Sequence, residues 1–201
     1  MSKGRGADPR VLFGTPDEGM RGNMPEELLD VIDDSDQVIA QAARADVHAR
    51  GLPHRGVHVF LFTPEGDLLI QKRSADRSQY ASLWDCSVSE HVKAGESYPE
   101  AAGRGLREEL GLTGISIQAL VRFRLVYGPN DNETSVLFKG SVDPAMVHFD
   151  PEEIEQFACY PPGKVVELME NGEMPFCGWF VQLMNWYTGG STEIEVLETW
   201  E

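Results

Sequence analysis

Apolar residues recur along the chain with two spacings, every second position in some segments and every third or fourth in others. Residues 57–62 (VHVFLF) and 67–73 (DLLIQKR) flank a Pro-Glu-Gly sequence at 64–66, a combination that predicts a β-hairpin. Residues 121–128 (VRFRLVYG) alternate apolar and polar side chains, which is typical of a strand. We expect residues 134–142 (TSVLFKGSV) to pair with this strand.

Segments nearer the two ends add further elements. Residues 27–34 (ELLDVIDD) and 37–41 (QVIAQ) are predicted as two strands with a turn at residues 34–36, and residues 43–55 as a connection. Residues 165–171 have the pattern of a short helix that stops at Gly172. A later helix is predicted by apolar residues on one helical face, typical of a core helix: Phe176, Phe180, Leu183, Met184 and Tyr187.

Between the strands, residues 98–110 carry the signals of a helix with defined ends. Ser97 and Glu100 have the S-x-x-E spacing of a capping box at the start of the helix. Gly111 is a natural stop, because glycine adopts the left-handed conformation that ends many helices. The apolar residues four positions apart line one face, which we expect to be buried: Ala102, Leu106 and Leu110.

The order of these elements predicts the fold class. Strands before and after a single helix, followed by terminal helices, indicate an α+β protein with a mixed sheet. We expect one domain over residues 25–190. Residues 1–24 carry Gly, Pro and mixed charge without periodicity, so a flexible N-terminal tail is expected there. Residues 191–201 are expected to be an acidic C-terminal tail.

Composition and charge narrow the range of partners. The 201 residues include 41% hydrophobic and 25% charged residues, as in soluble globular proteins, and no membrane-crossing apolar run. The formal net charge of −16 repels polyanions, so we expect no nucleic-acid partner. A phosphorylated small substrate would need divalent cations to bridge it to the acids. With no signal-peptide pattern and three widely spaced cysteines, a cytoplasmic location is expected.

Acidic side chains gather on the predicted helix over 98–110. Glu108 follows Arg104 by one helical turn, so the two can pair, and Glu109 is adjacent. Neighbouring acids near a helix C-terminus repel each other and gain nothing from the helix dipole. A solvated polar face is one explanation. Glu96 at the helix start supports another, an oxygen cage for Mg²⁺ or Mn²⁺ around the arginine.

Residues 89–112, SEHVKAGESYPEAAGRGLREELGL, resemble the Nudix box G-x5-E-x7-R-E-U-x-E-E-x-G-U, in which U is apolar. Seven residues match in register: Glu96, Arg104, Leu106, Glu108, Glu109, Gly111 and Leu112. Two positions depart, because Glu90 replaces the opening glycine and Gly105 replaces the glutamate after the arginine. In the family that glutamate usually supplies a metal ligand. Glu90 is either a displaced carboxylate that compensates for it or an exposed loop acid.

The resemblance covers roughly residues 26–190 and implies the Nudix fold, a mixed β-sheet sandwiched between α-helices. It implies cleavage of the diphosphate linkage of a small organic or nucleoside diphosphate, with Mg²⁺ or Mn²⁺ as cofactor. The catalytic residues it implies are Arg104, Glu108 and Glu109, and the metal-binding residues are Glu96, Glu108, Glu109, Glu133 and His91. Glu96 would hold Arg104 or reach a metal through water. Arg55 and Arg73 are the expected substrate-binding cations. A homodimer is common in the family, and the charge neither supports nor excludes one.

A second resemblance is to the type I isopentenyl-diphosphate isomerases, which share this scaffold. Their stretch W-T-N-x-x-C-x-H-P resembles residues 84–92, WDCSVSEHV, and their metal ligands fall on His54, His91, Asp131 and Glu133. Their catalytic cysteine falls on Ser89. Cys86 lies three residues earlier, and on a strand an odd offset points to the opposite face. An isomerase and a non-catalytic ligand-binding Nudix module are therefore the alternatives to a hydrolase.

Overall fold

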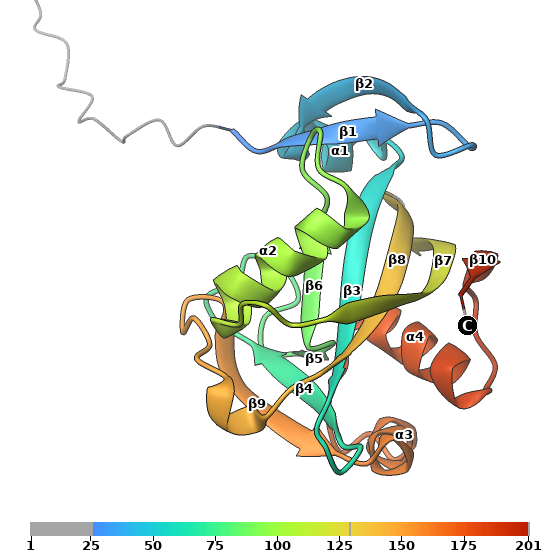
Figure 1. Ribbon diagram of the computed structural model, residues 1–201. Coiled ribbons are helices and arrows are strands. Elements are labelled where there is room, and N and C mark those ends of the chain that lie inside the picture. Colours follow the sequence, from blue (N-terminus) through green and yellow to red (C-terminus); the bar gives the residue numbers. More distant parts are fainter. Residues whose placement is uncertain (1–25, 129, 201) are drawn as a thin grey trace, which may run out of the picture.

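The computed structural model describes residues 26–128 and 130–200 (Figure 1). Its main sheet has the strand order β10-β7-β8-β3-β4-β5, with β6 paired to β3 and β9 paired to β4. The strands are β1 (Leu28–Ile32), β2 (Val38–Ala43), β3 (His54–Phe62), β4 (Leu68–Arg73), β5 (Trp84–Asp85), β6 (Val88–His91), β7 (Ile117–Gly128), β8 (Asp131–Ser141), β9 (Ile154–Tyr160) and β10 (Glu195–Thr199). The helices are α1 (Arg44–Arg50), α2 (Tyr98–Leu110), the short 3-10 helix η1 (Pro144–Met146), α3 (Pro162–Glu170) and α4 (Gly178–Thr188).

The sheet is mixed and has an apolar layer on each face. β3 runs parallel to β8 and antiparallel to β4 and β6. Val57 and Val59 of β3 pack with Leu106 of α2, whereas Phe60 packs with Phe180 of α4. Helix α2 lies against one face of the sheet in Figure 1, and α3 and α4 lie against the other side. This arrangement confirms the predicted α+β class, with a mixed β-sheet sandwiched between α-helices.

Helix α2 begins and ends where the sequence predicts. Glu100 Oε2 accepts hydrogen bonds from the Ser97 N–H at 2.9 Å and from the Ser97 hydroxyl at 2.6 Å, so the capping box is present. Gly111 has a φ of 67°, the left-handed conformation that lets the chain leave the helix. The predicted apolar face is buried against the sheet: Ala102, Leu106 and Leu110. The helix therefore has a fixed position and register over β3 and β6.

The N-terminal strands form a small sheet of their own, in which β1 pairs antiparallel with β2 as predicted. The predicted connection over residues 43–55 was incomplete, because it contains α1 and the start of β3. Val47 of α1 is buried with Leu29 and Val31 of β1. Packing against the hairpin thus stabilises a helix of seven residues, too short to be stable alone.

The C-terminal region confirms the predicted helices and corrects the predicted tail. Phe180, Leu183 and Met184 are fully buried on α4, whereas Phe176 precedes the helix and Tyr187 is exposed. Residues 191–201 are not simply a tail, because β10 within this segment pairs antiparallel with β7. Its acids face arginines of β7 across the pair, Glu195 with Arg124 at 3.1 Å and Glu198 with Arg122 at 3.2 Å. Opposite charges on neighbouring strands favour this pairing, which the negative charge of the segment alone does not reveal.

Two further expectations concern the N-terminal tail and the absence of a membrane-crossing segment. The flexible tail predicted for residues 1–24 lies outside the described residues. Within residues 26–128 and 130–200, no helix is both long enough and apolar enough to cross a lipid bilayer.

Candidate active site

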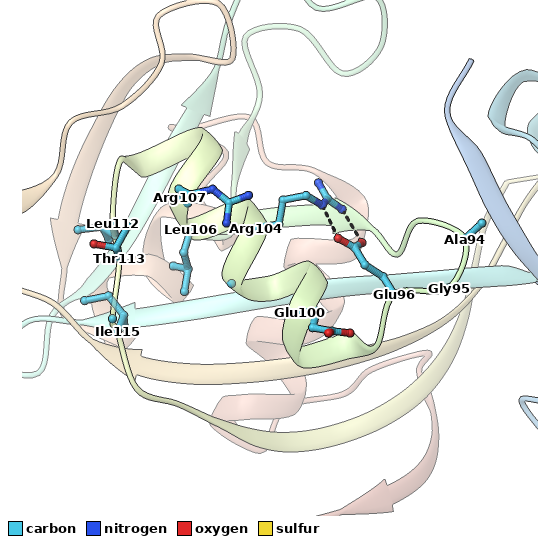
Figure 2. A pocket seen from close by; sticks show the side chains of 12 residues that line it. Ala94, Gly95, Glu96, Glu100, Arg104, Leu106, Arg107, Leu112, Thr113 and Ile115 are labelled. Carbon is cyan, nitrogen blue, oxygen red and sulfur yellow. Dashed lines mark hydrogen bonds and ion pairs between the residues drawn. The ribbon is translucent and has the colours of Figure 1, made fainter. Parts of the chain in front are cut away.

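Arg104 contacts three acids, Glu90, Glu96 and Glu108. Together with the neighbouring Glu109 we define them as the carboxylate cluster. The Arg104 guanidinium binds Glu96 through two nitrogens, at 2.8 and 3.1 Å (Figure 2). It also contacts Glu90 Oε2 at 3.1 Å, Glu108 Oε2 at 3.4 Å and the His91 carbonyl at 2.8 Å. Arg104 is 7% exposed, so these contacts are largely shielded from water. The arginine therefore links α2, β6 and the loop between them.

Glu109 is the most deeply buried acid of this cluster. Gln71 Nε2 donates a hydrogen bond to Glu109 Oε2 at 2.7 Å, whereas Glu109 Oε1 is buried without a hydrogen-bond partner. Burial, with the nearby charge of Glu90, raises the pKa of the Glu109 carboxyl well above its usual range. Glu108, in contrast, has a half-exposed side chain. The two adjacent acids of the helix thus lie in very different environments.

A second group of ligand-type side chains, the histidine cluster, consists of His48, His54, His91, Asp131 and Glu133. It is assembled from α1, β3, β6 and β8. His54 and Glu133 face each other across the parallel pair of β3 and β8, and β6 places His91 beside them. The carboxylate oxygens lie 2.7 Å (Asp131 to His48), 3.6 Å (Glu133 to His54) and 3.7 Å (Glu133 to His91) from imidazole nitrogens. The three imidazole rings are 5.0–5.2 Å apart.

The geometry of the histidine cluster suits a metal ion. In two sets, His48 with His54 and His91, and His54 with Asp131 and Glu133, one ligand atom per residue lies within 4.8 Å of the others. His54 Nδ1 is 2.9 Å from the Leu52 carbonyl, so in the neutral ring this nitrogen donates and Nε2 presents its lone pair inwards. That buried Nε2 atom makes no hydrogen bond. The residues present therefore fit a divalent cation.

The protonation of His91 and Glu133 matches the state that a metal requires. Burial lowers the pKa of His91 to about 3, so its imidazole is neutral at pH 7. Burial alone would raise the pKa of Glu133, but the nearby imidazoles of His54 and His91 lower it below its usual value. A neutral imidazole and an ionised carboxylate are the forms that bind metal ions.

One cavity of about 930 Å³ joins the two clusters. Both contribute to its walls, the carboxylate cluster through Glu90, Arg104 and Glu108, and the histidine cluster through His48, His91, Asp131 and Glu133. Four cationic side chains also line it: Arg44, Arg73, Arg77 and Lys93. Acids, imidazoles and cations around one cavity are the groups needed to hold a metal together with an anionic substrate.

The structure brings together most of the residues that the sequence predicts for the site, but not all of them. Arg73 lines the cavity as expected. Arg55 does not, because its guanidinium pairs with Asp36 at 2.6 Å and lies across the Tyr98 ring. Its role in substrate binding stays a prediction, and in this structure its guanidinium is paired with Asp36 of the β1–β2 turn.

The structure shows one of the two roles expected for Glu96. Both of its carboxylate oxygens bind Arg104, and the Lys93 N–H donates to one of them at 3.0 Å. Glu96 lines a different pocket, of about 560 Å³, on the side of α2 shown in Figure 2. Glu96 therefore holds Arg104 in this structure, and its binding of a metal stays a prediction.

His48 belongs to the site although the sequence analysis did not select it. The segment around it was expected to be a connection, whereas α1 directs its imidazole at Asp131. The available signal was its spacing, six residues before His54 and flanked by ordinary helix formers. Recognising the helix would have required knowing that β1 and β2 support it.

The position of Cys86 corrects a further expectation. Cys86 and Ser89 were expected on opposite faces of a strand, but both approach His58 Nδ1, at 3.9 and 3.1 Å. The strand is interrupted between β5 and β6, so alternation does not carry across residues 86 and 87. Burial and the charge of Asp85 raise the pKa of the Cys86 thiol well above its usual range. Its thiolate form is accordingly disfavoured.

Fold and site together define a protein of the Nudix class, in which a sandwiched sheet supports an acid-bearing helix. The family model of the NUDIX domain matches residues 52–179, and the chain belongs to this family. It is 29% identical to an uncharacterized Nudix hydrolase of Pseudomonas aeruginosa over 161 residues, which cover 80% of this chain and 93% of that protein. An isopentenyl-diphosphate Delta-isomerase of Serratia proteamaculans is 30% identical, with 79% and 90% of the two chains covered.

Two other similarities differ in extent. An uncharacterized Nudix hydrolase of Streptomyces coelicolor is 43% identical, but the match covers 45% of this chain and only half of that protein. The crystal structure of DR0079 from Deinococcus radiodurans has a TM-score of 0.69 and 27% sequence identity, and the match covers 79% of this chain and 98% of that one. The fold is therefore that of solved Nudix proteins.

Proposed function

We propose that the protein is a Mg²⁺- or Mn²⁺-dependent hydrolase that cleaves the diphosphate linkage of a small organic or nucleoside diphosphate. The observation that carries this proposal is the single cavity that joins the carboxylate cluster, the histidine cluster and four cationic side chains. Metal ligands and phosphate-binding cations around one space suit a substrate with two adjacent phosphates. Membership of the Nudix family supports the reaction class.

The positions of the residues around the cavity suggest a different role for each group. Arg73, Arg77 and Lys93 are placed to bind phosphate oxygens, and Arg104 holds Glu90 and Glu108 at the cavity wall. A divalent cation bound by the acids would neutralise developing phosphate charge and lower the pKa of a bound water. Glu109 lies deeper, and its buried Oε1 atom has no hydrogen-bond partner, so it is a candidate ligand for the same cation.

A turnover screen tests the proposal. Wild type, Glu109→Gln and the control Glu167→Gln are incubated with Mn²⁺ or Mg²⁺ and a panel of nucleoside diphosphate sugars, dinucleotides, nucleoside triphosphates and isopentenyl diphosphate. Glu167 is exposed on α3 and pairs with Lys164, so its substitution makes the same charge change outside the cavity. We expect metal-dependent cleavage by the wild type and the control, and a loss on the order of 100-fold in Glu109→Gln, because this variant lacks a ligand carboxylate. Equal turnover of all three proteins contradicts the role of Glu109.

An isomerase is the second candidate, and the histidine cluster favours it. The cluster contains the residues on which the isomerase metal ligands fall, and Serratia proteamaculans and Photorhabdus laumondii relatives carry the isomerase name. Against it, Ser89 stands where the resemblance requires a cysteine, and a hydroxyl ionises far less readily than a thiol. Incubation with isopentenyl diphosphate in D₂O, followed by NMR of the products, distinguishes an isomerase from a hydrolase. Deuterium incorporation into an allylic isomer would favour the isomerase.

A further inference from the structure

Gly105 occupies a position in α2 that has no room for a larger residue. A Cβ atom built there would lie 2.5 Å from Val88 Cγ1 and 3.0 Å from Glu90 Cγ, both closer than ordinary contact. Val88 and Glu90 are on β6, directly beneath this turn of the helix. The space that a helix side chain would use at position 105 is therefore filled by β6.

The carboxylate of Glu90 lies beside this position. Its Oε2 atom is 3.1 Å from Arg104 Nη1, and the residue lines the cavity. The unpaired Oε1 atom of Glu109 would be 3.6 Å from a Cβ at position 105, and Glu109 is only 5% exposed. A buried carboxylate oxygen without a partner thus points towards the same small space beneath α2 from which Glu90 reaches the cavity.

The charges in this space are unbalanced. Arg104 contacts three carboxylates, those of Glu90, Glu96 and Glu108, and Glu96 alone binds two of its nitrogens. The nearby cations Arg73 and Arg77 have carboxylate partners of their own, Asp85 and Glu153. Burying carboxylates without compensating charge is costly. Hard divalent cations bind through such oxygen ligands, and a bound cation would remove the imbalance.

We propose that Glu90 and Gly105 are a compensating pair: the carboxylate that the Nudix box supplies from the helix comes here from β6. Glu90 and Glu109 hold a divalent cation in this arrangement. The inference deepens the proposed function by naming a further metal ligand of the same site. Its test measures metal binding, so it does not depend on finding the substrate.

Mn²⁺ binding to the full chain, followed by electron paramagnetic resonance of the free ion, provides that test. We compare wild type, Glu90→Gln and the charge-matched control Glu167→Gln. The expected result is that the control binds like the wild type, whereas Glu90→Gln loses one class of Mn²⁺ site or binds it on the order of 10-fold more weakly. Unchanged Mn²⁺ binding by Glu90→Gln would overturn the inference and leave Glu90 as a structural partner of Arg104.

An exchange of the two residues sharpens the test. Val88→Ala makes room above β6, and in this background Glu90→Gly should lose the same Mn²⁺ site. Adding Gly105→Glu should restore it, because the carboxylate then comes from the helix. If the triple variant is folded by circular dichroism but fails to bind, the compensation is refuted. If it does not fold, Glu90→Gln decides alone.

The two proposals fail separately. Loss of the Mn²⁺ site in Glu90→Gln without any diphosphate turnover by the wild type would keep the metal ligand and reject the hydrolase. Diphosphate turnover by the wild type, with unchanged Mn²⁺ binding in Glu90→Gln, would keep the hydrolase and reject Glu90 as a metal ligand.

Discussion

At the scale of single residues, the carboxylate cluster contains more negative charge than its arginine balances. Glu109 shows the consequence most clearly, because it is buried with one oxygen unpaired and its pKa is raised. Such a group destabilises the metal-free protein and is expected where function requires it. The stability of the protein without metal and its activity should therefore respond to Glu109 in opposite directions.

Glu109→Gln should stabilise the metal-free protein, and the gain should depend on pH. In the unfolded chain a glutamate ionises near pH 4.3 or so, whereas the folded pKa of Glu109 is higher. Above the unfolded value the unfolded state releases its proton first, so the wild type loses stability as pH rises. The difference in Tm between variant and wild type should be near zero below that pH and increase towards neutral pH.

Thermal melts in EDTA across this pH range measure the effect. Glu167→Gln on α3 serves as the control, and its Tm difference should not follow the same pH dependence. A Glu109→Gln variant that is less stable than wild type at every pH would show that the carboxylate is compensated in the fold.

At the scale of elements, helix α2 and strand β6 pack closely against each other at Gly105 and Val88. The caps of α2 and its apolar face could be predicted, because Ser97, Glu100 and Gly111 act through contacts close in sequence. The contact between Gly105 and Val88 could not, since the distance between a helix and a strand appears only once the sheet has formed. In the sequence, Gly105 stands where the Nudix box has a glutamate. In the structure, a glycine is needed there because β6 leaves no room for a side chain.

Helix α1 and its site residue His48 could not be predicted from the sequence for the same reason, because they depend on tertiary contacts. The N-cap of α1, Ala43, makes no side-chain hydrogen bond, and Val47 is the only buried residue of this helix. Such a helix has weak local signals, and it is held by the β1–β2 hairpin. Acids and histidines close to the Nudix box could be identified from sequence, whereas His48 required the tertiary contact with Asp131.

Gly105→Ala should destabilise the protein, although alanine is the better helix former by about 0.5–1 kcal/mol. The new methyl group would overlap Val88 Cγ1, and overpacking of this kind costs about 1–3 kcal/mol. In a Val88→Ala background the same substitution should destabilise the protein less, although the approach to Glu90 Cγ remains. Denaturant unfolding of the four proteins of this double-mutant cycle measures the difference. Equal effects of Gly105→Ala in both backgrounds would contradict the tight contact.

At the scale of the whole molecule, the sheet brings two ligand clusters to one cavity. β3 and β8 supply His54 and Glu133, β6 supplies both His91 and Glu90, and α2 supplies Glu108 and Glu109. β6 therefore connects the two clusters, with its neighbouring residues 90 and 91 directed to one cluster each. A metal that binds only the folded protein stabilises it, by about 2.7 kcal/mol at a concentration 100 times its Kd.

Metal-induced stabilisation should depend on His48 and on pH. Mn²⁺ should raise the Tm of the wild type more than that of His48→Ala, because the variant loses a ligand of the histidine cluster. The pKa of His54 is raised, since its interactions with Glu133 outweigh the effect of burial. As pH falls through that value, protons compete with the metal and the Tm shift should shrink. An equal shift in both proteins would exclude His48 as a ligand.

The most direct test of the central claim follows oxygen from water into product. The wild type is incubated in ¹⁸O-labelled water with Mn²⁺ and a substrate identified by the turnover screen. The masses of the products are then measured by mass spectrometry. We predict ¹⁸O in one phosphate-bearing product, with the reaction abolished by EDTA and by Glu109→Gln but retained in Glu167→Gln. An unlabelled product with the mass of the substrate, or cleavage that continues in EDTA, would contradict a metal-dependent hydrolase.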